Sequence, residues 1–241
     1  MLTRISRLLA VAQLACASWA LAAGFQVNPV RVDLSSAHPN AVLTLSNPSP
    51  EKILVQAEAF SWQQAEGEDQ LQPTSAIMLN PPIFELQPGG RQLLRVGLRQ
   101  LPKGDGEQPY RLWLSQLPTA TGTSEPAAGD EPQGVKLLLR VSLPVFASSR
   151  TTGAARPVWQ WQPGDRLQVV NFGQRHLHLL KLSVSDGHGA SLDLPARYVL
   201  AGNDSVWQLP SGWHGRQLQI EADSDAGHLH ASLEASGLSR P

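Results

Sequence analysis

Most of the chain alternates between apolar and polar residues with a period of two, and the alternating runs are separated by Pro, Gly, Asn and Ser. Successive side chains of an extended strand point to opposite faces, so this period is typical of strands with one buried face. A helical period of 3.6 is almost nowhere seen. The sequence therefore predicts an all-β fold, which limits the chain to sandwiches, barrels and related sheet architectures.

The longest alternating run lies in residues 134–146, "GVKLLLRVSLPVF". Its polar face includes Lys136, Arg140 and Ser142. A strand over residues 135–145 would span about 36 Å, whereas a usual strand has about five or six residues. The apolar positions of the run are Val135, Leu137, Leu139, Val141, Leu143 and Val145.

Three interpretations of this run stay open from its period alone. It is a long core strand with a bulge or sheet switch at Pro144, or an edge strand offered to another polypeptide, or an aggregation-prone strand restrained by Lys136 and Arg140. The preceding segment, 118–134, is rich in Pro, Gly, Ala, Ser, Thr and acidic residues, which favours a long solvated loop.

Turn residues divide the remaining chain into two groups of expected strands, one on each side of a small, polar linker at residues 149–157. Each group has about the number of short strands found in an immunoglobulin-like sandwich. We therefore expect an immunoglobulin-like domain over residues 24–148 and a second β-sandwich domain over residues 158–241. The other expected strands cover residues 25–34, 40–47, 52–62, 76–86, 91–98 and 109–117, then 158–161, 166–171, 176–186, 198–202, 206–210, 216–222 and 228–234.

The first 23 residues have the layout of a secretory signal peptide. Arg4 and Arg7 lead into the apolar run 8–17, and small residues follow at 20–22. An uncleaved membrane anchor is the alternative, but the apolar run is short for a span of about 20 residues. We expect export to the periplasm with cleavage, after which no membrane insertion follows. Cys16 lies in this segment, so the mature chain would have no disulfide.

Charge and motifs exclude several functions. Without Arg4 and Arg7 the chain keeps 17 basic against 20 acidic residues, which gives no basic excess for binding nucleic acid. "QPGGRQ" joins two expected strands and does not open a helix, so it is no phosphate loop. The sequence contains no G-x-S-x-G nucleophile elbow and no paired carboxylates, so no motif suggests hydrolysis. We expect no enzymatic activity and no cofactor.

Two histidine pairs, His176 with His178 and His228 with His230, each lie on one face of an expected strand. Such pairs can ligate a metal. Because neither pair has a cysteine or a carboxylate cluster beside it in the sequence, we expect solvent-facing histidines and no metal site.

Tryptophans support an alternative function, a secreted carbohydrate-binding β-sandwich that stacks sugars on aromatic rings. Trp113 and Trp207 lie in alternating strands, which favours the core for both. Trp159 and Trp161 share a strand face after the linker, where they would pack at the domain interface. The tryptophans that follow the expected signal peptide are Trp62, Trp113, Trp159, Trp161, Trp207 and Trp213.

The order and spacing of several motifs resemble the periplasmic pilus-assembly chaperones of the chaperone/usher pathway. The "SLPVF" ending is similar to the archaic branch, which is associated with spore-coat-U-like pilins. The motifs that carry the resemblance are "NPVRVDLS", "LTLSNPSPEKILVQAEAFSW", "LNPPIFELQPGGRQLLRVGL", "PYRLWLSQLP" and "VKLLLRVSLPVF" in the first half, then "LQVVNFGQRHLHLLKLSV" and "YVLAGNDSVWQLP".

This resemblance implies two immunoglobulin-like domains in tandem, set at an angle, and a function without catalysis. Such chaperones lend apolar residues of a strand to a pilin that lacks its last strand, and then deliver the pilin to an outer-membrane usher. The implied partners are thus pilin subunits and the usher. Self-association of the free chaperone stays open. The implied donor residues are Val135, Leu137, Leu139 and Val141.

The family also implies a basic anchor in the cleft between the domains, which binds the carboxylate at the end of the pilin. Arg31 in "NPVRVDLS" matches the first-strand arginine of the family, but Ser142 stands where the usual lysine is expected. Arg111 and Arg140 are the substitutes that neighbouring strands offer. A family turn also implies a cis bond at Pro81 or Pro82.

Overall fold

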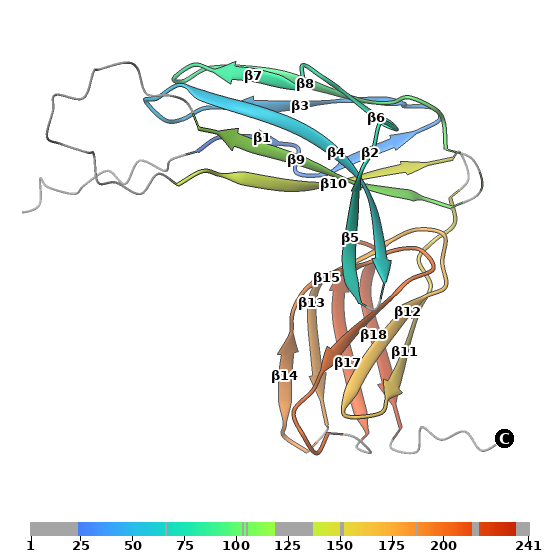
Figure 1. Cartoon of the computed structure of the whole chain (residues 1–241). Coiled ribbons are helices and arrows are strands. Elements are labelled where there is room, and N and C mark those ends of the chain that lie inside the picture. The colour runs from blue at the N-terminus through green and yellow to red at the C-terminus, as the bar shows by residue number, and fades with distance from the viewer. Residues whose placement is uncertain are drawn as a thin grey trace, which may run out of the picture.

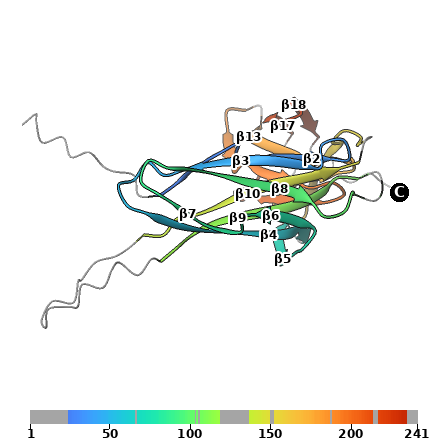
Figure 2. The same cartoon turned by 90° about the horizontal axis from the view of Figure 1, so that it is seen from above.

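The computed structural model describes residues 24–65, 67–102, 104, 106–118, 137–149, 152–186, 188–213 and 217–234. Two β-sandwiches follow one another along the chain and together form an L (Figure 1). The expected fold class, all-β with two immunoglobulin-like domains in tandem at an angle, is confirmed. Figure 2 shows the molecule from above, with the strands of the first domain running along its length. In these described ranges no helix is long and apolar enough to cross a membrane. The predicted signal peptide lies outside them.

The first domain packs two sheets face to face. One sheet has the order β1-β3-β8-β6, and the other has the order β2-β10-β9-β4-β5, with β7 paired to β4. Its strands are β1 (Gln26–Asn28), β2 (Val32–Ser35), β3 (Asn40–Ser46), β4 (Ile53–Ala65), β5 (Glu68–Pro73), β6 (Ile77–Asn80), β7 (Ile83–Leu86), β8 (Arg91–Leu98), β9 (Gln108–Leu117) and β10 (Arg140–Ser148).

Alternation explains the core of this domain. Leu43 and Leu94 from one sheet meet Val55 and Leu112 from the other, and all four are fully buried. The alternate residues of the same strands face solvent, as the period of two predicts.

Two of the predicted strands are each split at an Asn-Pro bond. Residues 25–34 form β1 and β2, which lie in different sheets, and residues 76–86 form β6 and β7, which also lie in different sheets. Pro has no N–H to donate to a ladder, so a strand is readily interrupted there. The Asn80–Pro81 bond is cis, and so is Asn28–Pro29, which the sequence analysis did not predict.

The second domain packs a sheet of order β11-β12-β16 on one of order β14-β13-β17-β18, with β15 paired to β13. Trp207 is buried in the core between them, as predicted, and Trp159 packs against it at a ring distance of 6.0 Å. The strands are β11 (Pro157–Gln162), β12 (Arg166–Asn171), β13 (Leu177–Ser185), β14 (Ser191–Leu194), β15 (Arg197–Val199), β16 (Asp204–Gln208), β17 (Leu218–Ser224) and β18 (Gly227–Leu233).

The hairpin of β4 and β5 reaches from the first domain onto the second (Figure 1). Trp62 of β4 is buried with Phe146 of β10 and Leu200 of the second domain, in a small cluster separate from both cores. The side-chain amide of Gln64 donates to the carbonyl of Tyr198 and accepts from the backbone N–H of Leu200, both at 2.9 Å. Strand β5 was not predicted, because its sequence "EDQLQP" has no buried face.

Candidate partner-binding edge and domain cleft

Strand β10 lies further along the chain than the sequence analysis predicted. It covers Arg140–Ser148 instead of residues 135–145, and residues 137–139 lie before it without strand geometry. Pairing with β9 begins slightly earlier, since the backbone N–H of Gln116 donates to the carbonyl of Leu139 at 2.8 Å. Strand β10 ends later than predicted because its parallel pairing with β2 continues through Ser148, although the apolar alternation has already stopped there.

One side of the first half of β10 is an open edge. Strand β9 pairs with residues 140–147, whereas β2 pairs only with residues 145–148. Residues 140–144 therefore have a ladder partner on one side only, within the part of the chain that the structure describes. We call this segment the open edge.

The backbone groups of the open edge point in a definite direction. The carbonyl of Leu139 faces β9 and the carbonyl of Ser148 faces β2, where it accepts from Ser36 at 3.3 Å. Because the direction alternates along a strand, the backbone groups of Arg140 and Ser142 point away from β9. Pro144 shares that direction but has no N–H, so it tolerates the unpaired side.

The apolar side chains along this strand become more exposed toward its beginning. Leu143 is buried, Val141 and Leu139 are partly buried against the core of the first domain, and Leu137 is 78% exposed. A Cβ built on Gly24 would lie 2.9 Å from Cδ2 of Leu139, so the backbone at Gly24 lies directly against Leu139. Val135, the remaining donor candidate, lies outside the described residues.

Arg31 lies at the joint between the domains and already has two acidic partners. Its Nε donates to both carboxylate oxygens of Asp33 at 3.0 Å, and its Nη1 donates to Oδ2 of Asp225 in the β17–β18 turn, also at 3.0 Å. Burial opposes its charge, but these hydrogen bonds and charges raise the pKa of Arg31 overall. Arg31 thereby ties the first domain to the second.

Arg111 lies at the same joint, and among the residues that the structure describes its one acidic contact is Asp69. Its guanidinium carbon lies 3.7 Å from the ring centre of Trp62 and 5.4 Å from that of Tyr198. The contact with Asp69 of β5 is a long one, 3.5 Å from Nη2 to Oδ2. Burial lowers the pKa of Arg111, although the charge of Asp69 opposes this. The structure therefore places both Arg31 and Arg111 at the joint between the domains, near Tyr198, which is where the resemblance implies the cleft of the anchor; their role as an anchor stays a prediction.

The structure does not bring Arg140 to this cleft. Arg140 opens β10 at the far end from the joint, where its Nε donates to Oγ of Ser115 at 2.9 Å and its guanidinium lies over the ring of Trp113. Trp113 itself is only partly buried and contacts Phe60, so its prediction as a core residue is wrong. Trp113 faces outward because odd-numbered residues of β9 point away from the core in this register. Arg140 shares the outward face with Arg111, but it lies four residues before Pro144, the β10 residue that pairs with Arg111.

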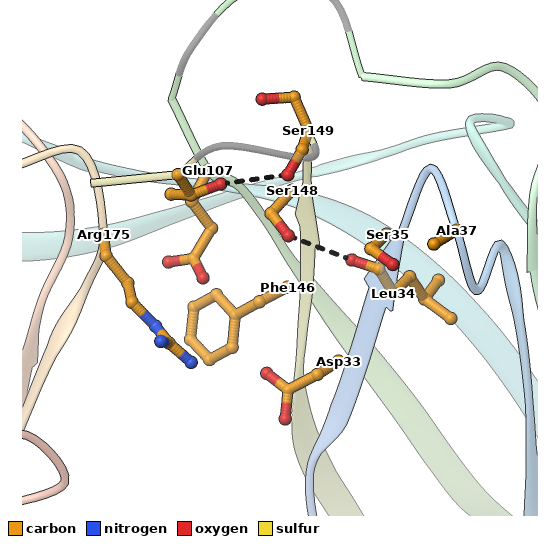
Figure 3. A pocket seen from close by; sticks show the side chains of 10 residues that line it. Asp33, Leu34, Ser35, Ala37, Glu107, Phe146, Ser148, Ser149 and Arg175 are labelled. Atoms are coloured by element: carbon orange, nitrogen blue, oxygen red, sulfur yellow. Dashed lines mark hydrogen bonds between the residues drawn. The ribbon is translucent and has the colours of Figure 1, made fainter. Parts of the chain in front are cut away.

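A pocket of about 280 Å³ opens beside the joint (Figure 3). Asp33, Glu107 and Arg175 surround the ring of Phe146 in it. The hydroxyl of Ser148 donates to the carbonyl of Leu34 at 3.5 Å and links the two parallel strands at its wall. The pocket thus combines acidic and basic side chains around the aromatic ring of Phe146.

His176 corrects the prediction for the first histidine pair. Its side chain is fully buried, stacks on Phe146 with ring centres 3.5 Å apart, and faces carboxylates of both Glu107 and Asp225. His178 is half-buried and stacks on Tyr198. Solvent exposure was inferred because no cysteine or carboxylate cluster stands beside the pair in the sequence, but the carboxylates that face His176 come from residues distant in sequence.

The second pair fits its prediction. The side chains of His228 and His230 are 62% and 57% exposed, and both contact Glu221. The hydrogen bonds that the ring of His228 donates to the carboxylates of Asp223 and Glu221 raise the pKa of His228. No cluster suited to a metal ion occurs among the residues that the structure describes.

The functional residues that sequence reasoning missed are Glu107, Asp225 and Gln64. Each contacts a residue of the other domain more than 60 positions away, and no local pattern marks it. Turn position was the only signal available, and it does not distinguish Asp225 from other turn carboxylates.

Comparison with known proteins places these features in a family. The family model described as pili and flagellar-assembly chaperone, PapD N-terminal domain, matches residues 24–150. The curated "Chaperone protein FimB/FhaD" of Bordetella pertussis is 26% identical over 231 residues, which are 91% of this chain and 91% of that protein.

Solved structures of low identity share the fold. The complex of CsuC with CsuE, from archaic chaperone-usher Csu pili of Acinetobacter baumannii, includes a chain that matches with a TM-score of 0.66 and 20% identity over 88% of this chain and 99% of that one. The complex of SafA pilin with the SafB chaperone of Salmonella enterica includes one that matches with a TM-score of 0.63 and 18% identity over 87% and 96%. The sequence resemblance is thus confirmed, and the chain belongs to the family of pili and flagellar-assembly chaperones.

Proposed function

We propose that this protein is a periplasmic chaperone that holds a pilin subunit by donor-strand complementation and delivers it to an outer-membrane usher. The observation that carries the proposal is the open edge at residues 140–144, preceded by the exposed Leu137. A guest strand beside this edge would find unpaired backbone groups for its ladder and apolar side chains for its core. The role is one of binding, and it needs no catalytic group.

The donor residues would be Val135, Leu137, Leu139 and Val141. Leu139 and Val141 are partly buried at the edge of the first domain's core. Apolar side chains of a bound pilin would pack against them and continue that core. Each fully buried Val or Leu contributes about 1.5–3 kcal/mol, and several together would hold a subunit without covalent chemistry. The role of Val135 is supported by the alternation of the sequence.

The carboxylate at the end of the pilin would be bound in the cleft by Arg31 and Arg111. A charge-assisted hydrogen bond there would set the register of the guest strand as well as add affinity. Arg111 keeps one long contact to Asp69, so its donors are the easier ones to recruit. Arg31 would have to share its donors with Asp33 and Asp225.

We place the chaperone in the archaic branch of the pathway. Its "SLPVF" ending supports this. Export to the periplasm is supported by the layout of residues 1–23.

Co-purification from the periplasm tests the proposal. The tagged protein is expressed with the small secreted pilin encoded beside it, as wild type, as Leu137→Asp and as Leu93→Asp. Leu93 is a matched control, since it is also an exposed leucine, at 50%, but lies in the other sheet on β8. We expect a one-to-one complex for wild type and Leu93→Asp, and loss of at least tenfold in recovered pilin for Leu137→Asp. Equal recovery with both variants would contradict the donor assignment.

A further inference from the structure

The ring of His176 is held at the joint by groups from both domains. It follows the loop that leads into β13 of the second domain, and it stacks on Phe146 of the first domain at 3.5 Å with an interplanar angle of 6°. Its side chain has no solvent exposure. The ring therefore cannot turn to change its partners without separating the two surfaces.

Both ring nitrogens face carboxylates, and the carboxylates come from different domains. Nδ1 lies 2.5 Å from Oε2 of Glu107 in the first domain, and Nε2 lies 3.0 Å from Oδ2 of Asp225 in the second. A neutral imidazole has one N–H and one lone pair, whereas the charged form donates from both nitrogens. Nδ1 has hydrogen-bond geometry to Glu107, whereas Nε2 lies at ion-pair distance from Asp225 without hydrogen-bond geometry. The imidazolium therefore holds Glu107 by a hydrogen bond and Asp225 by its charge, and the neutral ring would lose the attraction to Asp225.

These contacts belong to a chain of alternating charges that crosses the joint twice. Asp33 and Arg31 of the first domain lead to Asp225 of the second, and His176 of the second leads back to Glu107 of the first. Without the charge on His176, the single cation Arg31 would face three carboxylates in this chain. The carboxylates of Asp225 and Glu107 would then face a neutral ring from its two sides, with no positive charge between them.

We propose that charged His176 locks the two domains in their present arrangement, and that the joint loosens when this imidazolium loses its proton. The inference concerns the chaperone by itself and does not depend on its pilin. It assigns a pH-sensitive lock to a place in the fold that is separate from the open edge.

The surroundings of the ring determine the direction of the pH effect. Burial alone would lower the pKa of His176, but hydrogen bonds and charges from Asp225 and Glu107 outweigh it and raise the pKa above its ordinary 6.5. The lock is therefore complete below about pH 6.5 and is lost as the pH rises through the raised pKa. The titratable and charged groups that face the joint from the surrounding elements are Arg31, Asp33, Glu107, Arg111, Arg175, His178, Tyr198 and Asp225.

Distance measurement between two spin labels tests the lock in the whole protein. Labels on Gln100→Cys and Ser191→Cys place one probe on an exposed site of each domain, and the only native cysteine lies in the predicted signal peptide. We expect a narrow distance distribution at pH 5.5 and a broader one at pH 8.5. His176→Gln is expected to give the broad distribution at both values. The neighbouring variant His178→Gln is the matched control and is expected to respond as wild type does.

Two results would overturn the proposal: an unchanged wild-type distribution between the two pH values, or the same pH response in His176→Gln as in wild type. A titration of the ring protons by NMR keeps the test valid if His176→Gln does not fold. In wild type the His176 signal should titrate with a midpoint above 6.5, and Glu107→Gln should lower that midpoint. A wild-type midpoint at or below 6.5 would also overturn the proposal.

Discussion

The two ends of strand β10 have opposite surroundings although the sequence alternates through most of both. At the beginning, residues 140–144 pair on one side only, and apolar side chains become more exposed toward Leu137. At the end, residues 145–147 pair on both sides, and Phe146 is buried under the second domain. One strand thus belongs to the joint between the domains at one end and has an unpaired edge at the other.

Truncation of the two ends should therefore give very different losses of stability. Leu143→Ala removes a side chain that is 3% exposed, and we expect about 2–5 kcal/mol less free energy of unfolding. Leu137→Ala removes one that is 78% exposed, and we expect a change within about 0.5 kcal/mol. Urea unfolding of both variants measures the difference. Equal losses would mean that the two ends are packed alike.

The side-chain amide of Gln64 should also contribute to stability at the joint between the domains. Gln64→Ala leaves the carbonyl of Tyr198 and the N–H of Leu200 without their partner, which costs about 1–3 kcal/mol when such groups stay buried. Thermal unfolding checks the loss of stability. Gln63→Ala is the neighbouring control, because Gln63 is exposed. If both variants behave as wild type, the Gln64 amide contributes nothing to the stability of the joint.

The smallest expected effect is on acid stability. Burial opposes the charge of Asp225, but His176, the backbone N–H of His178 and Arg31 lower its pKa well below the usual range. Its stabilisation is therefore present above about pH 4 and is lost as the pH falls toward the lowered pKa. Asp225→Asn should flatten the fall of the thermal midpoint between pH 4 and pH 2. Asp223→Asn, at a largely exposed carboxylate, should keep the wild-type slope; a wild-type slope in Asp225→Asn would contradict the assignment.

Sequence reasoning succeeded where the information is local. Strands β8 and β12 begin and end where the alternation predicted them, since each has one buried and one exposed face. It was less accurate where pairing outlasts the alternation, as in β10, or where a strand has no apolar face, as in β5. Resemblance to a family supplied the positions of Arg31 and Arg111 at the cleft, which no period of residues could supply.

The sequence by itself determined the all-β fold, the two tandem sandwiches, most of the strands and the alternating apolar series of residues 135–145. Side-chain alternation and turn residues act within a few positions, so they can be seen without coordinates. Only the tertiary structure decided that the edge is open at residues 140–144 and that His176, Glu107, Arg31 and Asp225 meet at the joint. The physical reason is that pairing and charge contact depend on which surfaces the two domains bring together, across separations of tens to nearly 200 residues.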